Sequence, residues 1–291
     1  MNERTKGSEL AKKIRQLRDR LARRFFDTRY GRDMLIKAIG SRTLDMTVDC
    51  GDHRMTFSPS DYLGRSVFVK GHFDRDHVDR LMGKLAELGI GVQGKVLLEI
   101  GGNIGTHTVY FGLTGAFGRI VSVEPDPRNF ELLKTNIAQN GFSELAIPIN
   151  CAASDIEGEI DFFLHPTNHG KSSPTPGSAA DIRITVPAKP VPAILEAAGV
   201  AIEDVGLIWI DIEGYEPVAA RSMKALFARR VPVHAEFTSA FYGREQAAAY
   251  VAFLAEFYED CIIFFGDDPP VSMKVRDIPL DREQFDLLLI P

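Results

Sequence analysis

The pattern of apolar and polar positions changes near residue 95. From Lys95 onward, short apolar runs alternate with turns and with segments of helical spacing. This order of strand, turn and helix is typical of a mostly parallel sheet with helices on both faces. We therefore expect a doubly wound α/β domain over residues 91–291, preceded by a front section over residues 1–90.

The expected elements of the α/β domain can be placed along the chain from this alternation. Strands are predicted at residues 96–100, 120–123, 145–151, 160–164, 207–210, 231–237, 261–265 and 285–290. Helices are predicted at residues 106–114, 127–140, 192–198, 217–228 and 247–258. A polar segment rich in Pro, Gly and Ser, residues 165–181, predicts a long loop. No long helix separates the last two strands, so one of them is expected to be antiparallel.

The front section begins with a basic amphipathic pattern. A helix is predicted over residues 8–26, because apolar residues recur at helical spacing with basic residues between them: Leu10, Ile14, Leu17, Leu21 and Phe25. We expect this helix to pack on the body of the protein or on a second copy in a homodimer. Peripheral contact with an anionic surface such as a membrane, and a frayed arm, are the alternatives.

The remainder of the front section predicts a small cap. Residues 47–57 alternate around Gly51-Asp52, which is a strong signal for a β-hairpin. Residues 67–69 predict a further strand, and residues 74–88 predict a helix that ends at Gly89. We interpret this section as a cap or substrate-facing appendage of the α/β domain.

Composition and charge limit the class of protein. The chain has 291 residues, of which 45% are hydrophobic and 25% charged, and it is long enough to bury a substantial core. The net charge of −6 is unevenly distributed, since residues 1–32 hold eleven Lys and Arg against four Asp and Glu. The rest of the chain is acidic, which argues against nucleic acid as a partner.

The chain also lacks signals for export and for a metal framework. No apolar run approaches the roughly 20 residues that span a bilayer, and the first residues lack the apolar centre of a secretion signal. Cys50, Cys151 and Cys261 are far apart and have no metal-ligand spacing, so we expect reduced thiols and no structural zinc. A soluble, cytoplasmic protein is expected.

The first candidate site segment follows the strand at residues 96–100. Ligands of open α/β sheets bind beyond the carboxyl ends of the strands, and here Glu99 precedes a turn framed by Gly101 and Gly105. A dinucleotide loop has a further glycine and holds a pyrophosphate, which a carboxylate would repel. A carboxylate would attract the ammonium of an amino-acid ligand, so S-adenosylmethionine fits this turn better than a nicotinamide dinucleotide.

Two more acidic segments lie at strand ends. Glu124 follows the next strand and could accept hydrogen bonds from both ribose hydroxyls of a nucleoside, although it could instead cap the next helix. Asp211 ends the apolar strand at residues 207–210, where a buried acid is costly unless it is used or paired. Glu213 and Glu216 follow it, and the negative charge of Glu216 could stabilise the N-terminus of the next helix.

Four segments together resemble the FkbM family of methyltransferases in order and spacing: LEIGGNIGTHTVYF, VSVEPDPRNFELLKTNI, NCAASD and IWIDIEGYE. The resemblance covers about residues 60–240. It implies a class I, seven-stranded Rossmann-like fold, S-adenosylmethionine as cofactor, and methyl transfer to a hydroxyl of a sugar, glycolipid or other natural product. Glu99 stands where the family usually has Asp, and Gly102 stands where Ala is usual.

The resemblance also assigns residues. It implies that the cofactor is bound by the glycine turn, the ribose-binding acid and the segment beside adenine, together with the Asp-x-Glu-Gly motif: Gly101, Asn103, Gly105, Glu124, Ala152, Ala153, Ser154, Asp211, Glu213 and Gly214. Residues 168–173 are similar to a polar loop that many members place over the site. The basic N-terminal helix lies outside the shared pattern.

Methyl transfer to an alcohol needs a base, or a metal that acidifies the hydroxyl. His169, Asp211 and Glu236 are the candidate catalytic residues, with His165 and His107 as further candidates for the base. His169 is favoured because imidazole titrates near neutral pH and lies in the predicted loop. Asp211 and Glu236 end successive strands and could hold Mg²⁺ through oxygen ligands, but two carboxylates are a weak signal and no metal-ligand set is assigned.

Two other functions remain open from the sequence. One is a nicotinamide-dependent dehydrogenase, against which the missing dinucleotide glycine counts. The other is a non-catalytic, cofactor-binding module that recruits a partner through residues 8–26. The residues do not identify the methyl acceptor, which is expected to be a small molecule or carbohydrate.

Overall fold

The main sheet determines the architecture of the protein. The computed structural model describes residues 3–40, 42–266, 268–282 and 284–291. Its largest sheet has eight strands in the order β12 (Val271–Lys274), β11 (Asp260–Phe264), β13 (Phe285–Leu289), β10 (Val233–Phe237), β9 (Val205–Ile210), β3 (Val96–Ile100), β4 (Arg119–Val123) and β5 (Ala146–Ile149). Strands β10, β9, β3, β4 and β5 run parallel, whereas β13 is antiparallel to both of its neighbours.

The doubly wound, mostly parallel α/β fold is confirmed, and so is the antiparallel strand near the C-terminus. The expected seven strands are corrected to eight, because β12 pairs antiparallel with β11 at the edge of the sheet. This strand is only four residues long and largely exposed. Strand β12 therefore has no apolar run from which it could have been predicted.

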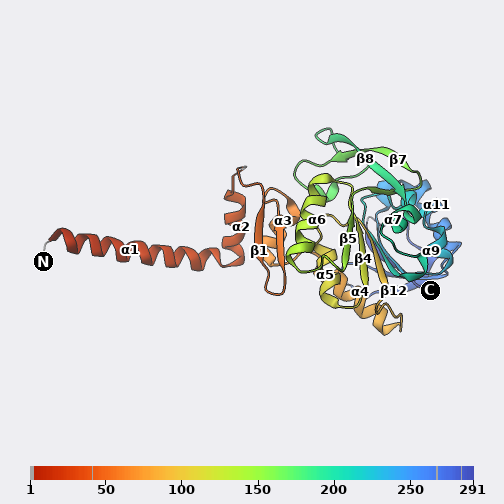
Figure 1. Cartoon of the computed structure of the whole chain (residues 1–291), viewed down its shortest axis with the longest axis horizontal. Helices are drawn as coiled ribbons and strands as arrows, with labels where there is room; N and C mark the ends of the chain where they lie inside the picture. Colours follow the sequence, from red (N-terminus) through yellow and green to blue (C-terminus); the bar gives the residue numbers. More distant parts are fainter. Residues whose placement is uncertain (1–2, 41, 267, 283) are drawn as a thin grey trace.

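Helices cover both faces of the main sheet (Figure 1). One face carries α7 (Val191–Ala197), α8 (Glu216–Arg221), α9 (Lys224–Ala228) and α11 (Arg244–Ala255), and the other carries α4 (Arg75–Glu87), α5 (Thr106–Thr114) and α6 (Pro127–Gln139). A hydrophobic core lies on each face of the sheet, and the side chains of β3 alternate between the two. Leu98 and Ile100 pack in the first core, under α7, α8, α9 and α11, and Leu97 packs in the second, under α4, α5 and α6. Helix α4 packs in the second core through Val78 and Leu81, although it precedes residue 90.

Several element boundaries differ from the sequence expectation. The helix predicted over residues 217–228 is divided between α8 and α9, and α10 (Ser239–Tyr242) precedes α11. The strand predicted over residues 145–151 ends with β5 at Ile149, and the chain then enters a different sheet. Two single turns of 3₁₀ helix, η2 (Ile202–Asp204) and η3 (Val275–Asp277), complete this part of the chain.

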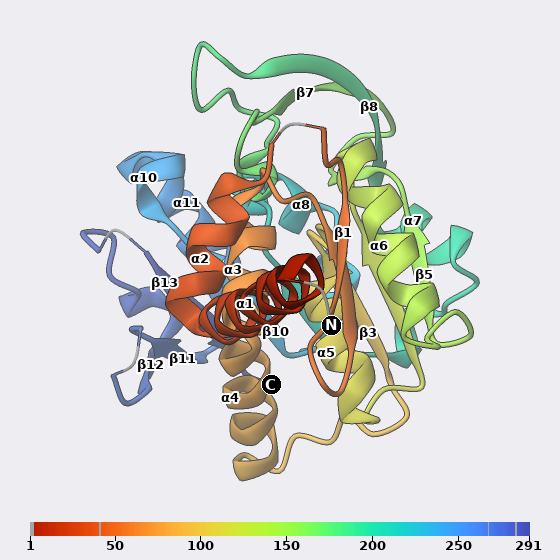
Figure 2. The same cartoon turned by 90° about the vertical axis from the view of Figure 1, so that its left-hand side faces the viewer.

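A second sheet of three strands lies beside the main sheet. Its order is β6 (Ala152–Ser154), β8 (Ile182–Pro190) and β7 (Gly158–Leu164), and β7 and β8 form a long antiparallel pair. In Figure 2 this pair forms an arch at the top of the molecule. The predicted loop over residues 165–181 connects the two strands and contains the 3₁₀ turn η1 (His169–Lys171).

The cap is built from α2 (Arg29–Ala38), β1 (Met46–Asp49), β2 (Arg54–Phe57) and α3 (Tyr62–Lys70). The predicted hairpin is confirmed, since β1 and β2 pair antiparallel. The strand predicted at residues 67–69 is wrong, because these residues belong to α3. Asp61 caps that helix by accepting hydrogen bonds from the backbone N–H groups of Leu63 and Gly64. A third core joins the cap to Ile104, next to the glycine turn.

The first helix, α1 (Glu3–Phe26), confirms the predicted amphipathic helix and begins earlier than expected. It extends away from the rest of the molecule instead of packing on it (Figure 1). The side chains of Ile14, Leu17 and Leu21 are exposed, while that of Leu10 lies outside the described residues. The expectation that this helix packs on the body of the protein is therefore wrong. Within the described residues, no helix combines the length and apolar character needed to cross a membrane.

Candidate functional site

A cavity of about 620 Å³ lies at the carboxyl ends of the parallel strands. The strand tips contribute Gly101, Glu124, Asp211 and Glu236 to its lining. The cap contributes Tyr62, Leu63 and Phe73, and the loop between β7 and β8 contributes residues 168–172 and 174. This volume lies in the range of small-molecule sites, roughly 300–1,000 Å³.

The glycine turn after β3 forms the floor of the cavity. Gly101 has a φ of +97°, and a Cβ built there would lie 1.8 Å from the backbone oxygen of Asp211. Only glycine therefore lets the β3 and β9 tips approach this closely. Asn103 also lines the cavity with a positive φ of +49°. Gly105 begins α5 and does not line the cavity, and a Cβ there would lie 2.9 Å from Leu133 Cδ1.

Glu124 lies at the tip of β4 with both carboxyl oxygens bonded to the backbone. Oε2 accepts a hydrogen bond from the Asn103 N–H at 2.7 Å, and Oε1 accepts one from the Asp126 N–H at 2.7 Å. Burial, followed by the charge of Asp126, raises the pKa of Glu124 to about 8, while the two N–H donors act in the opposite direction. The side chain joins the glycine turn to the β4 tip and lines the cavity.

Glu99 does not lie in the cavity, which corrects the expectation that it contacts the ligand there. It is the fourth residue of β3 and fully buried, on the same face of the sheet as Leu97. Thr108 of α5 donates a hydrogen bond from Oγ1 to Glu99 Oε2 at 2.5 Å. Burial raises the pKa of Glu99 to about 7. The physical reason is strand alternation, which directs this side chain under α5 while the next residues turn into the cavity.

The segment expected beside adenine lies on the same side of the cavity as Glu124. Ala152 and Ala153 line the cavity together with Val123 and Cys151, so this wall is apolar. Ser154 does not line it, and its Oγ lies 3.2 Å from the hydroxyl of Tyr215. Ser154 is thus placed to orient Tyr215, which does line the cavity.

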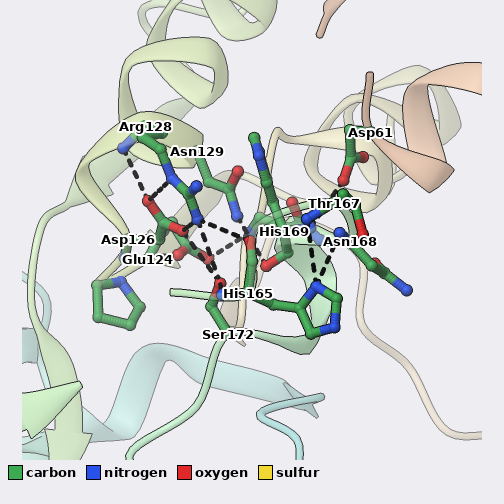
Figure 3. A network of polar contacts seen from close by, with 12 residues as sticks. Asp61, Glu124, Asp126, Arg128, Asn129, His165, Thr167, Asn168, His169 and Ser172 are labelled. Carbon is green, nitrogen blue, oxygen red and sulfur yellow. Dashed lines mark hydrogen bonds and ion pairs between the residues drawn. The ribbon is translucent and has the colours of Figure 1, made fainter. Parts of the chain in front are cut away.

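An ion pair fixes the loop over the cavity (Figure 3). Asp126 is fully buried at the N-terminus of α6 and pairs with Arg128 at 2.7 Å. Ser172 of the loop donates from Oγ to Asp126 Oδ2 at 3.2 Å, and Arg128 Nη2 donates to the His165 carbonyl at 3.4 Å. These contacts attach the polar loop, residues 165–173, to the tip of β4.

His169 and His165 of this loop differ in their contacts and in their position relative to the cavity. The His169 N–H donates to Asp61 Oδ1 of the cap at 2.7 Å, and its carbonyl accepts from Asn129 at 3.4 Å (Figure 3). Its Nδ1 is buried and has no hydrogen-bond partner among the described residues, and burial lowers the pKa of the imidazole. His165 does not line the cavity, and its Nδ1 accepts the Asn168 N–H at 3.0 Å, so it orders the loop.

Asp211 and Glu236 lie on the opposite side of β3, at the tips of β9 and β10. Burial, then the charge of Glu236, raises the pKa of Asp211 well above its ordinary value. Burial, then the charge of Glu213, raises the pKa of Glu236 to about 8. A smaller compartment of about 270 Å³ shares both residues with the cavity and adds Asp286. The acidic residues predicted at these strand ends are therefore brought together.

His107 lines both the cavity and the smaller compartment. Burial lowers the pKa of its imidazole to about 3, and its ring lies 4.7 Å from the Trp209 ring centroid. An imidazole with this pKa remains neutral at pH 7 and is poorly suited to accept a proton. No group of three or more His, Cys, Asp and Glu in the described part of the chain is arranged to hold a metal, so the Mg²⁺ expectation gains no support.

Some lining residues were missed by sequence reasoning: Asp74, Asn129 and Gln284, together with the aromatic residues of the cap. Asp61 was also missed, and it holds the loop through a contact that spans 108 positions. The Asp-Tyr-Leu-Gly sequence at residues 61–64 could have indicated a helix cap. No local signal could have indicated its partner in the loop.

Comparison with known proteins places the site in a family. Residues 99–260 match the methyltransferase FkbM domain. No curated protein matches the chain. TYW2 of M. jannaschii, solved with AdoMet, is similar with a TM-score of 0.46 at 10% identity, over 86% of this chain and 87% of that one. The O-methyltransferase TomG of Streptomyces achromogenes, solved with SAM, has a TM-score of 0.44 at 13% identity, over 79% and 87%.

Proposed function

Because the chain belongs to the FkbM family of methyltransferases, we propose that it binds S-adenosylmethionine in this cavity and methylates a hydroxyl oxygen. The acceptor is a sugar, a glycolipid or another hydroxyl-bearing natural product. In this proposal, residues 91–291 bind the cofactor, and the cap within residues 1–90 helps to enclose the acceptor.

The carboxyl-rich lining of the cavity is the observation that carries the proposal. Five carboxyl side chains line it, namely those of Asp74, Glu124, Asp211, Glu213 and Glu236. Among the described lining residues, Lys171 is the only Lys or Arg. This lining suits a cationic ligand without phosphate, because a cation would stabilise the ionised form of carboxyls whose pKa values burial has raised. S-adenosylmethionine supplies two such charges, a sulfonium and an ammonium. The pyrophosphate of a nicotinamide dinucleotide would be repelled by these carboxyls when they are ionised and would find Lys171 alone as a countercharge among the described lining residues, which disfavours the dehydrogenase alternative.

The residues of the Glu124 side fit the nucleoside part of this cofactor. Glu124 can accept hydrogen bonds from ribose hydroxyls, since each carboxylate oxygen has a second lone pair. The apolar wall formed by Ala152 and Ala153 suits the face of an adenine ring. Gly101 and Asn103 would lie beneath the amino-acid part. Gly105 and Ser154 are proposed to act indirectly, because they support α5 and Tyr215.

When bound, the cofactor supplies the activated methyl group and the driving force for its transfer. The protein must align the acceptor oxygen and remove its proton. We assign the base to the acidic pair, with Glu236 accepting the proton and Asp211 orienting the acceptor. A base with a pKa near 8 is well matched to an enzyme working near neutral pH. His169 contacts the cap and Asn129 on the Glu124 side, so it is the second candidate for the base.

Calorimetry tests the cofactor assignment. We expect the full-length protein to bind S-adenosylmethionine and S-adenosylhomocysteine and not NAD⁺. Glu124→Ala should weaken binding of both by about 10- to 100-fold, because it removes the ribose acceptor and leaves two buried N–H groups without a partner. Glu131→Ala, an exposed position on α6, is the matched control and should bind like the native protein. Binding of NAD⁺ instead, or native affinity in Glu124→Ala, would overturn the assignment.

A further inference from the structure

The first helix carries an exposed surface that the rest of the protein does not cover. Ile14, Leu17 and Leu21 are exposed to 59%, 55% and 57%, although they form one apolar stripe along α1. Phe25 continues the stripe at 40% exposure, and Tyr30 at the start of α2 lies beside it with ring centroids 6.1 Å apart. A contiguous apolar surface of this kind marks an interaction site.

The junction with α2 holds α1 away from the body. Thr28 Oγ1 donates to the Phe25 carbonyl at 2.7 Å and accepts the Gly31 N–H at 3.0 Å. A Cβ at Gly31 would lie 2.1 Å from the Phe25 oxygen, so glycine is required for the close approach of the two helices. Arg32 donates from Nε to the Val69 carbonyl of α3 at 3.1 Å, which ties this junction to the cap. The projecting direction of α1 is thus supported by specific contacts.

The charges on α1 are arranged around the apolar stripe. With 3.6 residues per turn, basic residues lie along both edges of the stripe: Lys13, Arg20 and Arg24 on one side, and Arg15 and Arg18 on the other. The opposite side of the helix carries charges of both signs, Glu9 and Asp19 together with Lys12 and Arg23, so the excess of basic residues lies beside the stripe. Long basic side chains at the edges of an apolar face can extend to anionic headgroups while the face enters the membrane interface.

The same charges disfavour pairing of α1 with a second copy. A coiled-coil seam of Ile14, Leu17 and Leu21 would be flanked by Lys13, Arg18 and Arg20. In either relative orientation these flanking positions would bring cations against cations. Residues 1–32 carry eleven basic and four acidic residues, so with −6 for the whole chain the remainder carries −13. An anionic surface would attract α1 and repel the body, which matches their separation in Figure 1.

We propose that α1 is a peripheral anchor that lies in the interface of an anionic lipid membrane. Its apolar stripe enters the headgroup region, and its basic edges bind the negatively charged lipids. The acidic body remains in the water and is held close to the membrane by the junction at Gly31. This anchor does not depend on the methyltransferase proposal, since neither the cavity nor its ligands contribute to it.

Vesicle sedimentation with the full-length protein tests the anchor. We expect binding to vesicles of mixed phosphatidylcholine and phosphatidylglycerol, little binding to phosphatidylcholine alone, and loss of binding at high salt. Leu17→Ala with Leu21→Ala keeps good helix formers and removes much of the apolar stripe, so affinity should fall about tenfold or more. Gln16→Ala with Asp19→Ala changes the opposite side and should retain native or slightly stronger binding.

The outcomes separate the membrane from other occupants. Analytical ultracentrifugation should show a sedimentation coefficient that the Leu17→Ala, Leu21→Ala pair does not change. A dimer that this pair dissociates, without binding to the mixed vesicles, would show that a second copy covers the stripe and would overturn the proposal. Equal binding to both kinds of vesicle, or equal losses in the two double variants, would also contradict it. Thermal unfolding identifies any variant with a damaged body.

Discussion

The two sides of the cavity use carboxyl groups in different ways. On the cofactor side, both oxygens of Glu124 are held by backbone N–H groups at 2.7 Å. On the other side, Asp211 and Glu236 lie among other carboxyls. The charge of Glu236 adds to burial in raising the pKa of Asp211, and the charge of Glu213 does the same for Glu236. The pKa values of Glu124 and Glu236 are both raised to about 8, so the two sides differ in what holds the carboxyl oxygens. Backbone donors fix both oxygens of Glu124, whereas Glu236 lies beside other carboxyls whose charge favours its protonated form. In the proposed function, these neighbours, and not the residue type, separate the binding role of Glu124 from the catalytic role of Glu236.

Gly101 connects the two sides, and its substitution should have the largest effect. In Gly101→Ala the new Cβ would meet the Asp211 backbone oxygen at 1.8 Å, with a φ of +97° that disfavours alanine. We expect the free energy of unfolding to fall by about 3 kcal/mol or more, and both cofactor binding and activity to be lost. Urea unfolding and calorimetry measure this. Gly83→Ala, on α4 with no atom near its Cβ site, is the control and should be tolerated.

Glu236→Gln should damage the acceptor side alone. Removing a general base typically lowers kcat by about 10²- to 10⁴-fold, while the affinity for S-adenosylhomocysteine should remain native. The exposed Glu256→Gln of the α11 end is the matched control. If the affinity for the cofactor falls as much as kcat does, Glu236 belongs to the binding machinery and the division between the two sides fails.

The pH dependence of kcat distinguishes Glu236 from His169. A carboxyl with a pKa of about 8 is protonated below that pH, so its basic form and the rate should increase until about pH 8 and then level off. The pKa of His169 is lowered from 6.5, so a rate governed by this residue would already be level at pH 7. His169→Ala should keep the rise with pH. Loss of that rise in His169→Ala would show that His169 of the loop, and not Glu236, is the base.

Glu99→Gln should have the smallest effect and would sharpen the contrast with Glu124. The pKa of Glu99 is about 7 in the folded protein and near 4.5 when unfolded, so ionisation of the unfolded chain reduces stability as pH rises from 4.5 to 7. The glutamine variant should lose about 1–3 kcal/mol of this pH dependence and keep native cofactor affinity. Urea unfolding at pH 5 and pH 8 measures the first effect. Weaker binding of the cofactor by this variant would contradict the prediction and would show that Glu99 contributes to the cofactor site.

The sequence correctly predicted the elements whose own residues show both the type of structure and which side chains are buried. Strands β3 and β9 are apolar runs interrupted only by Glu99 and Gly206, and the Asp126 cap and the following proline mark the start of α6, so these elements were placed correctly. It failed at residues 67–69, where a short apolar run fits a strand or a buried helix equally well. It also missed β8, although Ile182, Ile184 and Val186 alternate there with polar residues. It missed β12 because VSMK has little apolar pattern of its own and is stabilised by pairing with β11.

What the sequence determined by itself was the family, the order of most strands and helices of the α/β domain, and the presence of acids at successive strand ends. These follow from residue type and spacing, which are local properties. The tertiary structure alone decided that Glu99 lies under α5 while Glu124 lines the cavity, that Asp61 holds His169, and that α1 leaves its apolar stripe uncovered. Each of these depends on where distant segments pack. Alternation along a strand fixes the direction in which a side chain points, but the element packed opposite decides whether that side chain is buried in a core or lines a cavity.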